Sequence, residues 1–143
     1  AADVESVSME ELAARSDYVS CHIPLNPNTE NIIDASFFEQ MKPGAYFVNT
    51  SRGGVVKEAD LIAALEEGRI AGAGLDVFES EPIELDHPFL AMENVVLTPH
   101  TASCADETYA QRDRDVGVAA VALARGEIPE HVANPDVLDH RRT

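Results

Sequence analysis

The stretch Val48-Asn49-Thr50-Ser51-Arg52-Gly53-Gly54-Val55-Val56 decides how this chain folds. The apolar run at residues 45–48 is typical of a buried strand, and a helical pattern with Leu61, Ile62 and Leu65 on one face follows soon after. A strand, a polar turn and a helix in this order indicate an α/β arrangement, in which ligands bind at the carboxyl ends of strands. The arginine in such a turn can hold a carboxylate through two parallel hydrogen bonds, and the glycines let the backbone approach a ligand closely. The alternative is an ordinary loop with a solvated arginine.

The composition favours one acidic globular domain. The chain has 143 residues, 45% of them hydrophobic, and carries 10 Lys and Arg against 26 Asp and Glu, a net charge of −16. This charge repels nucleic acid phosphates and anionic membranes, so we expect neither as a partner. No stretch approaches the roughly 18 apolar residues of a membrane helix, and we expect no signal peptide. Cys21 and Cys104 lack the spacing of metal ligands, so we expect buried thiols in a reducing cytoplasm and no metal site.

Strand patterns alternate with helix patterns along the chain. The expected strands cover residues 18–23, 45–48, 70–78 and 94–98. The expected helices cover residues 8–15, 34–41, 57–67 and 103–126, with Ser8, Asp34 and Ser103 near their starts and Gly68 as a C-cap. Strands separated by helices pair in parallel through right-handed crossovers. We therefore expect an α/β fold: an incomplete Rossmann-type, doubly wound parallel sheet of about four strands, with helices on both faces and a long C-terminal helix.

Three predicted strands in succession end in chemically capable side chains. Their ends carry Ser51 and Arg52, then Asp76 with Glu79 and Glu81 just beyond, and finally His100. Because parallel strands point their carboxyl ends the same way, we expect an arginine, a carboxylate and a histidine around one crevice. Such a set suits a proton-coupled reaction of a small acid, since histidine exchanges a proton near neutral pH and a carboxylate on its other nitrogen fixes the tautomer.

Several of these residues also have simpler interpretations. The residues alone do not choose between Glu79 and Glu81 as the partner of His100. Glu81 is also compatible with a solvated acid, and His100 with a loop histidine whose hydrogen bonds are satisfied. Asp76 is harder to explain as a surface residue, because burial without a partner would cost several kcal/mol. His22, at the end of the first predicted strand, can face the same crevice. His87, His131 and His140 fall in loops or in the tail, where we expect structural or exposed roles.

Longer motifs resemble those of the D-isomer-specific 2-hydroxyacid dehydrogenases. Two of them are Gly74-Leu75-Asp76-Val77-Phe78-Glu79-Ser80-Glu81-Pro82 and Asn94-Val95-Val96-Leu97-Thr98-Pro99-His100. The matching segments are residues 16–25, 41–45, 48–56, 71–82, 87–88, 94–100 and 132–135, in the order and spacing of that family.

The resemblance implies an oxidoreductase that uses NAD, with NADP not excluded, to interconvert D-2-hydroxy acids and 2-keto acids by hydride transfer. Arg52 would bind the substrate carboxylate and carbonyl oxygen, His100 would be the general acid/base, and Glu81 would be its carboxylate partner. Asp76 would hold the nicotinamide carboxamide. The cofactor-binding residues would be His22, Pro24, Thr50, Ser51, Arg52, Asp76, His100, Ala102 and Ser103.

The chain has no G-x-G-x-x-G, since Gly72-Ala73-Gly74 lacks a third glycine and lies within a predicted strand. By the resemblance, residues 1–126 would be the C-terminal half of the dinucleotide-binding domain, and residues 127–143 a tail that would join the substrate domain. We therefore expect little or no activity from the chain alone, and self-association, such as a homodimer, through an uncovered sheet edge and apolar flank. The alternative function is a dehydrogenase-like, nucleotide-sensing binding protein without turnover, although such a protein needs no proton donor. A hydrolase using Ser51 or Ser103 lacks the G-x-S-x-G turn.

Overall fold

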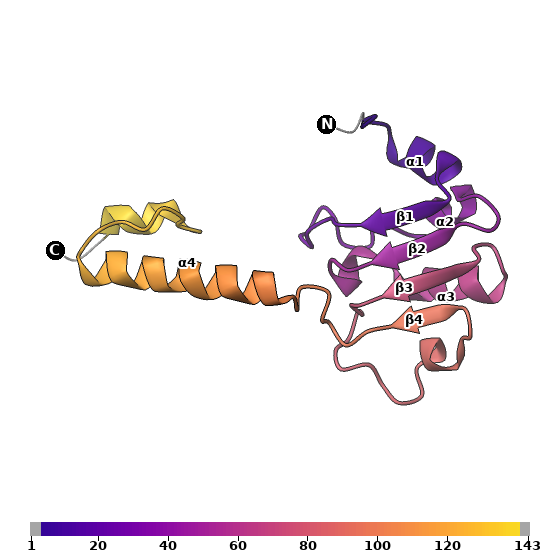
Figure 1. The fold of residues 1–143 in the computed structure, drawn as a ribbon. Helices are drawn as coiled ribbons and strands as arrows, with labels where there is room; N and C mark the ends of the chain where they lie inside the picture. The colour runs from indigo at the N-terminus through magenta and orange to yellow at the C-terminus, as the bar shows by residue number, and fades with distance from the viewer. Residues whose placement is uncertain (1–3, 141–143) are drawn as a thin grey trace. The chain divides into compact units, whose positions relative to one another are not determined.

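Four short strands form one parallel sheet within residues 4–140, the part of the chain that this computed structural model describes (Figure 1). They are β1 (Tyr18–Cys21), β2 (Tyr46–Asn49), β3 (Gly72–Leu75) and β4 (Val95–Leu97), and they lie side by side in chain order. The predicted four-stranded parallel sheet is thus confirmed. Of the strand expected at residues 70–78, only β3 pairs with its neighbours, so the observed strand is shorter than the apolar segment that predicted it.

Three helices accompany the sheet: α1 (Met9–Arg15), α2 (Ala35–Gln40) and α3 (Glu58–Glu66). α2 packs against both α1 and α3, and all three contribute to one core. Each crossover moves one strand further in the same direction, and right-handed crossovers of this kind place every connecting helix on the same face. Within residues 4–102 the second face, where we had also expected helices, therefore has none.

Burial alternates along the strands accordingly. Val19, Phe47 and Ala73 are paired in register and buried under the helices. Tyr18 and Tyr46 point to the other face, where they stack with ring centroids 5.4 Å apart and stay 72% and 44% exposed. The strands thus obey the period of two that a half-covered sheet imposes.

Aromatic side chains fill the space between the helices and the sheet. Phe38 of α2 meets Phe47 of β2 edge to face, with centroids 5.4 Å apart and planes at 90°. Full burial of such a side chain contributes roughly 1.5–3 kcal/mol. The largest fully buried side chains are Phe38, Phe47, Phe89, Leu61, Ile70, Val55 and Asn49. Asn49 is the one polar member of this group, and it is the last residue of β2, just before the turn that carries Arg52.

Local capping explains where the helices begin and end. The Ser8 hydroxyl accepts a hydrogen bond from the Glu11 amide, and the Asp34 carboxylate accepts from the amides of Ser36 and Phe37. Gly68 follows α3 with φ +66°, the left-handed conformation expected of a C-terminal capping glycine. These three caps are confirmed. The short 3-10 helices η1 (Gly53–Val55) and η2 (Pro88–Ala91) were not expected.

Residues from Ser103 onward form a second compact unit. It contains α4 (Asp106–Ala124) and η3 (Pro135–His140). The long helix is confirmed, but its N-cap is Ala105 rather than Ser103. No residue of α4 is buried. Among residues 4–140, no helix combines the length and the apolar content that crossing a bilayer requires.

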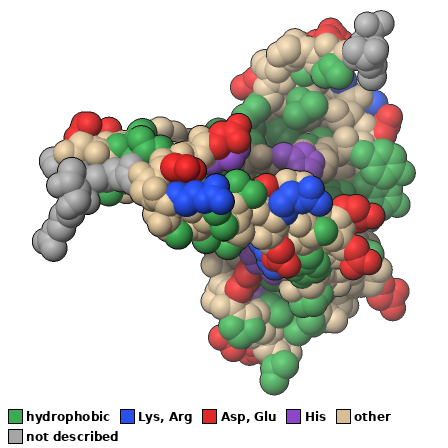
Figure 2. Space-filling model, turned by 60° about the vertical axis from the view of Figure 1, so that its left-hand side comes forward, with side chains coloured by type: hydrophobic (Ala, Val, Ile, Leu, Met, Phe, Trp, Pro, Cys, Tyr) green, Lys and Arg blue, Asp and Glu red, His purple; other side chains and the backbone are tan. Residues whose placement is uncertain are grey.

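On the face drawn in Figure 2 the acidic side chains are scattered among hydrophobic and uncharged side chains. A net charge of −16 spread in this way is typical of a solvated surface.

Candidate active site

The turn after β2 is built around the buried amide of Asn49. Its Oδ1 accepts hydrogen bonds from the amide and the hydroxyl of Ser51, at 2.9 and 2.8 Å, and its Nδ2 donates to the Arg52 carbonyl at 3.1 Å. Asn49 is only 1% exposed, so these bonds replace the water that its amide loses. The backbone that carries Arg52 is therefore held from within the core.

Gly53 brings this turn against the segment that follows β3. A Cβ on Gly53 would lie 1.9 Å from both the carbonyl carbon and the carbonyl oxygen of Phe78. No side chain fits at that distance, so only glycine allows the contact. Sequence reasoning had assigned the glycines of this turn to the approach of a ligand. Gly53 lines the cleft described below, and it also approaches the protein's own backbone, three residues before Glu81.

Asp76 organises the loop that carries His100. Its carboxylate accepts hydrogen bonds from the Thr98 hydroxyl and, at 2.8 Å each, from the amides of Thr101 and Ala102. Burial acts to raise the pKa of Asp76, which is 3% exposed, but these hydrogen bonds outweigh it and hold the pKa below its usual value. His100, between the donors, has φ +54°, a conformation that non-glycine residues adopt rarely. The carboxylate thus stabilises an uncommon backbone geometry at the histidine.

Glu81 is the carboxylate that contacts His100. Its Oε2 lies 2.8 Å from His100 Nδ1, and its Oε1 accepts from the Phe78 amide at 3.1 Å. The His100 side chain, first, and the Phe78 amide lower the pKa of Glu81 below its usual value. Glu79 points elsewhere and accepts from the Glu58 amide at 2.9 Å. The structure therefore makes the choice between the two glutamates that the residues alone left open.

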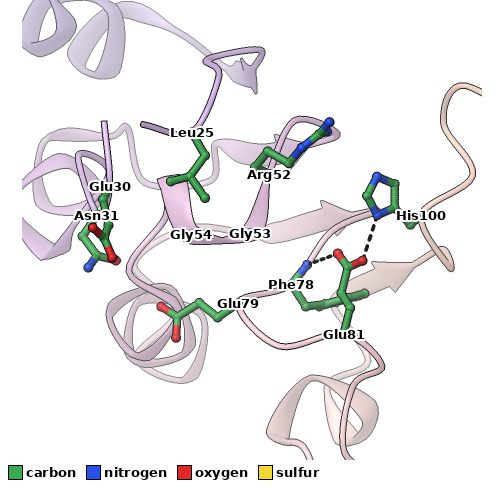
Figure 3. A pocket seen from close by; sticks show the side chains of 10 residues that line it. All are labelled: Leu25, Glu30, Asn31, Arg52, Gly53, Gly54, Phe78, Glu79, Glu81 and His100. Carbon is green, nitrogen blue, oxygen red and sulfur yellow. Dashed lines mark hydrogen bonds and ion pairs between the residues drawn. The ribbon is translucent and has the colours of Figure 1, made fainter. Parts of the chain in front are cut away.

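A cleft of about 510 Å³ brings these groups together. Arg52, Glu81 and His100 all line it (Figure 3). In this view the Arg52 side chain points away from the Glu30 and Asn31 end and toward the His100 side. The other lining residues are Leu25, Glu30, Asn31, Gly53, Gly54, Phe78 and Glu79. The cleft joins a guanidinium that can hold a carboxylate to a carboxylate–imidazole pair that can exchange a proton.

A second hollow of about 530 Å³ adjoins the first and shares Arg52 and Leu25 with it. Three further residues predicted to bind a cofactor, His22, Pro24 and Ser51, line this hollow. His22 Nε2 lies 2.8 Å from the Ser20 hydroxyl. The two hollows together are lined by Arg52, Glu81 and His100 and by three predicted cofactor residues, His22, Pro24 and Ser51.

The other four predicted cofactor residues line neither hollow, and Asp76 among them is buried beneath the His100 loop. Thr50 follows β2 but lines neither hollow, and Ala102 takes part through its amide on Asp76. Ser103 is the first residue of the second unit. Among residues 4–140 no group of three or more His, Cys, Asp or Glu side chains is placed to hold a metal ion.

Residues 1–102 match the family described as D-isomer specific 2-hydroxyacid dehydrogenase, NAD binding domain. The chain belongs to the D-isomer specific 2-hydroxyacid dehydrogenases. It is 49% identical over 138 residues to a glyoxylate reductase of Korarchaeum cryptofilum, a match that covers 96% of this chain and 42% of that protein. The chain thus spans less than half the length of this relative.

Solved structures of the same family agree in fold. One is a D-lactate dehydrogenase with NAD+ from Lactobacillus jensenii, with TM-score 0.82 and 32% identity over 90% of this chain and 42% of that one. Another is a D-isomer specific 2-hydroxyacid dehydrogenase from Xanthobacter autotrophicus in complex with NADPH and MES, with TM-score 0.77 and 37% identity over 90% of this chain and 52% of that one.

Sequence reasoning did not single out two supporting residues of this chain, Asn49 and Glu58, and it assigned His87 only a structural or exposed role. Asn49 directly follows the predicted strand at residues 45–48 and precedes Thr50, so it gave no signal beyond being polar at a strand end. Glu58 looked like an ordinary acid in the first turn of a helix. His87, expected to be structural or exposed, has a side chain only 17% exposed and lies 2.9 Å from Glu58. The contact between His87 and Glu58 joins residues 29 positions apart, so neither residue alone reveals its partner.

Proposed function

We propose that this chain forms part of an NAD(P)-dependent oxidoreductase that interconverts D-2-hydroxy acids and 2-keto acids. The observation that carries the proposal is the 2.8 Å contact between Glu81 and His100 on the cleft that Arg52 also lines. Membership of the family supports it, as do relatives named glyoxylate reductase and D-lactate dehydrogenase.

His100 is the proton donor and acceptor in this proposal. Because Nδ1 faces Glu81, the nitrogen left for a substrate is Nε2. In the reduction of a 2-keto acid, protonated Nε2 gives its proton to the carbonyl oxygen at C2, which becomes the hydroxyl. In the reverse reaction neutral Nε2 takes the hydroxyl proton. The Glu81 carboxylate holds the ring orientation in both directions and compensates the imidazolium charge.

Arg52 positions the acid. Its guanidinium can hold the substrate carboxylate through two parallel hydrogen bonds and polarise the neighbouring C2 oxygen. The carboxylate would thereby place C2 and its oxygen beside the imidazole. Because the substrate is oriented when it binds, the entropy cost of alignment is met before the reaction starts, and the activation free energy is lower.

The residues around the second hollow fit a dinucleotide. His22, Pro24 and Ser51 would hold it there, next to Arg52. Asp76 keeps unused acceptor capacity after its three hydrogen bonds, so it would also accept from a carboxamide. When bound, the nicotinamide supplies or accepts the hydride at C2. We propose NAD as the cofactor, with NADP as the alternative.

We further propose that residues 1–126 act as the C-terminal half of a dinucleotide-binding domain and that residues 127–143 join a substrate domain. A match that covers 96% of this chain and only 42% of a curated relative supports a role as part of a longer protein. On this proposal the 143 residues alone have little or no turnover, the protein is a cytoplasmic homodimer, and its substrate is a small 2-hydroxy or 2-keto acid.

The test is oxidation of NADH with glyoxylate, pyruvate and hydroxypyruvate by a full-length protein carrying this sequence. We expect turnover with at least one acid, lost in His100→Ala while NADH still binds. A binding protein without turnover would bind NADH but would not oxidise it with any of the three acids, either as the wild type or as His100→Ala. Rates from the isolated 143 residues equal to those of the full-length protein would refute the proposed division.

A further inference from the structure

The connection between β3 and β4, which carries Glu81, is tied at two points to one carboxylate. Glu58, the first residue of α3, accepts a hydrogen bond from the Glu79 amide on Oε2 at 3.2 Å. Its Oε1 lies 2.9 Å from Nε2 of His87. Glu79 returns the contact, because its own carboxylate accepts from the Glu58 amide at 2.9 Å. Residues 79 and 87 are therefore both anchored to Glu58, with Glu81 between them.

His87 is itself fixed by the core. Its Nδ1 accepts from the Phe89 amide at 3.3 Å, so the hydrogen lies on Nε2 and is donated to Glu58. The ring lies 4.9 Å from that of Phe89, which is 1% exposed. The side chains of His87 and Glu58 are 17% and 16% exposed, so their contact is shielded from solvent.

These contacts also reach the turn that carries Arg52. α3 begins six residues after Arg52, and Gly53 lies against the Phe78 backbone, next to Glu79. The Phe78 amide in turn donates to Glu81. Two sets of contacts thus join the turn of the guanidinium to the segment of the carboxylate, one through Gly53 and one through Glu58.

We propose that Glu58, Glu79 and His87 form a clamp that positions the Glu81 carboxylate on His100. The clamp residues do not touch a substrate in this account, so they are positioning residues that act through Glu81. The inference rests on the proposed function in one respect: that the Glu81–His100 pair acts as the acid–base pair of the reaction. Apart from His100 itself, the Glu81 carboxylate, which is 37% exposed on a connection of about 20 residues, has the Phe78 amide as its hydrogen-bond partner.

The test is NMR of the 143-residue chain with variants of His87. The first readout is the pKa of the Glu81 carboxyl, which reports its contact with His100 and the Phe78 amide. In His87→Phe we expect this pKa to rise toward that of an unpaired glutamate. The second readout is exchange of the Phe78 amide, which we expect to become roughly fivefold faster as its acceptor moves away.

A rescue and a control separate positioning from general stability. His87→Gln keeps a donor for Glu58, so we expect it to restore the lowered pKa of Glu81. His131→Phe, at an exposed histidine of the second unit, should change neither readout. Should His87→Phe not fold, Glu58→Gln serves instead, with exposed Glu66→Gln as its control on α3.

Unchanged values of both readouts in a folded His87→Phe or Glu58→Gln protein would overturn the clamp. A raised Glu81 pKa that His87→Gln does not restore would overturn the assigned contact with Glu58. Neither result depends on turnover. Failure of the proposed function, which would appear as no NADH oxidation by the full-length protein, is therefore distinguishable from failure of the clamp.

Discussion

Glu81 Oε2 lies 2.8 Å from His100 Nδ1 although 19 positions separate the two residues in the sequence. Parallel pairing of β3 and β4 brings their following loops to one edge of the sheet. Glu81 is held within its own loop by the Phe78 amide, whereas the loop of His100 is held from the end of β3 by Asp76, which accepts from Thr98 and Thr101. The pair is thus a consequence of strand topology, of one local hydrogen bond to Glu81 and of the long-range hydrogen bonds that Asp76 accepts.

Replacing Arg52 tests its role as the anchor of a carboxylate. We expect Arg52→Lys to lower kcat/KM for a 2-keto acid by roughly 10- to 100-fold, because a lysine keeps the charge but cannot make two parallel hydrogen bonds. Steady-state kinetics of the full-length protein measure this. Arg69→Lys, on the far side of α3 in sequence, is the matched control. An Arg52→Lys enzyme with unaltered kcat/KM would show that the guanidinium does not hold the substrate.

Alanine substitutions at Gly53 and at its neighbour Gly54 test whether the close approach of Gly53 to Phe78 requires glycine. Gly53→Ala should lower the free energy of unfolding by roughly 2–3 kcal/mol, since its Cβ would meet backbone atoms at 1.9 Å. Gly54→Ala should cost less than about 1 kcal/mol, because its nearest neighbour, 3.2 Å away, is the flexible end of the Leu25 side chain. Chemical denaturation of the 143-residue chain measures both. Equal losses would mean that the contact with Phe78 is not the constraint.

Asp76 should make stability depend on pH. Its folded-state pKa lies below the usual value, so the ionised carboxylate stabilises the fold. This contribution is fully present above the unfolded-state pKa of about 3.9 and is lost as pH falls through the lower folded-state pKa. We expect Asp76→Asn to be roughly 1–3 kcal/mol less stable at pH 7, because the side-chain NH2 group of the asparagine would then face a backbone N–H that now donates to the carboxylate.

That difference in stability should narrow as the pH is lowered below about 4. Urea denaturation of both proteins across this range gives the two curves, with exposed Glu39→Gln as a control that should follow the wild type. A difference that stays constant down to pH 2 would contradict an ionised, hydrogen-bonded Asp76.

The uncovered face of the sheet should drive self-association. Tyr18 and Val96 on this face are 72% and 69% exposed, and β1 is an edge strand. We expect the 143-residue chain to form dimers in sedimentation experiments, more so at high salt, which screens its net charge of −16. Tyr18→Lys should weaken the dimer, whereas Leu85→Lys, at a residue 97% exposed in the β3–β4 connection, should not. A strict monomer at high concentration would count against this expectation.

Sequence patterns predicted most local elements because the signals are local. Ser8, Asp34 and Gly68 act within one turn of their own helix, and the strands carry apolar runs that any parallel sheet requires. The position of the helices on a single face was not predicted, because it depends on strand order, which no single segment encodes.

The site divides in the same way. That Arg52, a carboxylate and His100 would converge followed from strand ends alone. The choice of Glu81 over Glu79 depends on the path of the backbone after Phe78, which Gly53 and Glu58 set from elsewhere in the chain. The contact between His87 and Glu58 is likewise tertiary, so neither residue alone reveals it, whereas Asn49 bonds to Ser51 and Arg52 in its own turn.

The most direct test of the Glu81–His100 pair is a double-mutant cycle on kcat/KM in the full-length protein, using Glu81→Gln, His100→Ala and the double variant. If the carboxylate acts only through the imidazole, Glu81→Gln should cost roughly 10²-fold in the wild type and almost nothing when His100 is already alanine. Independent losses that multiply in the double variant would contradict the pair as a single acid–base unit.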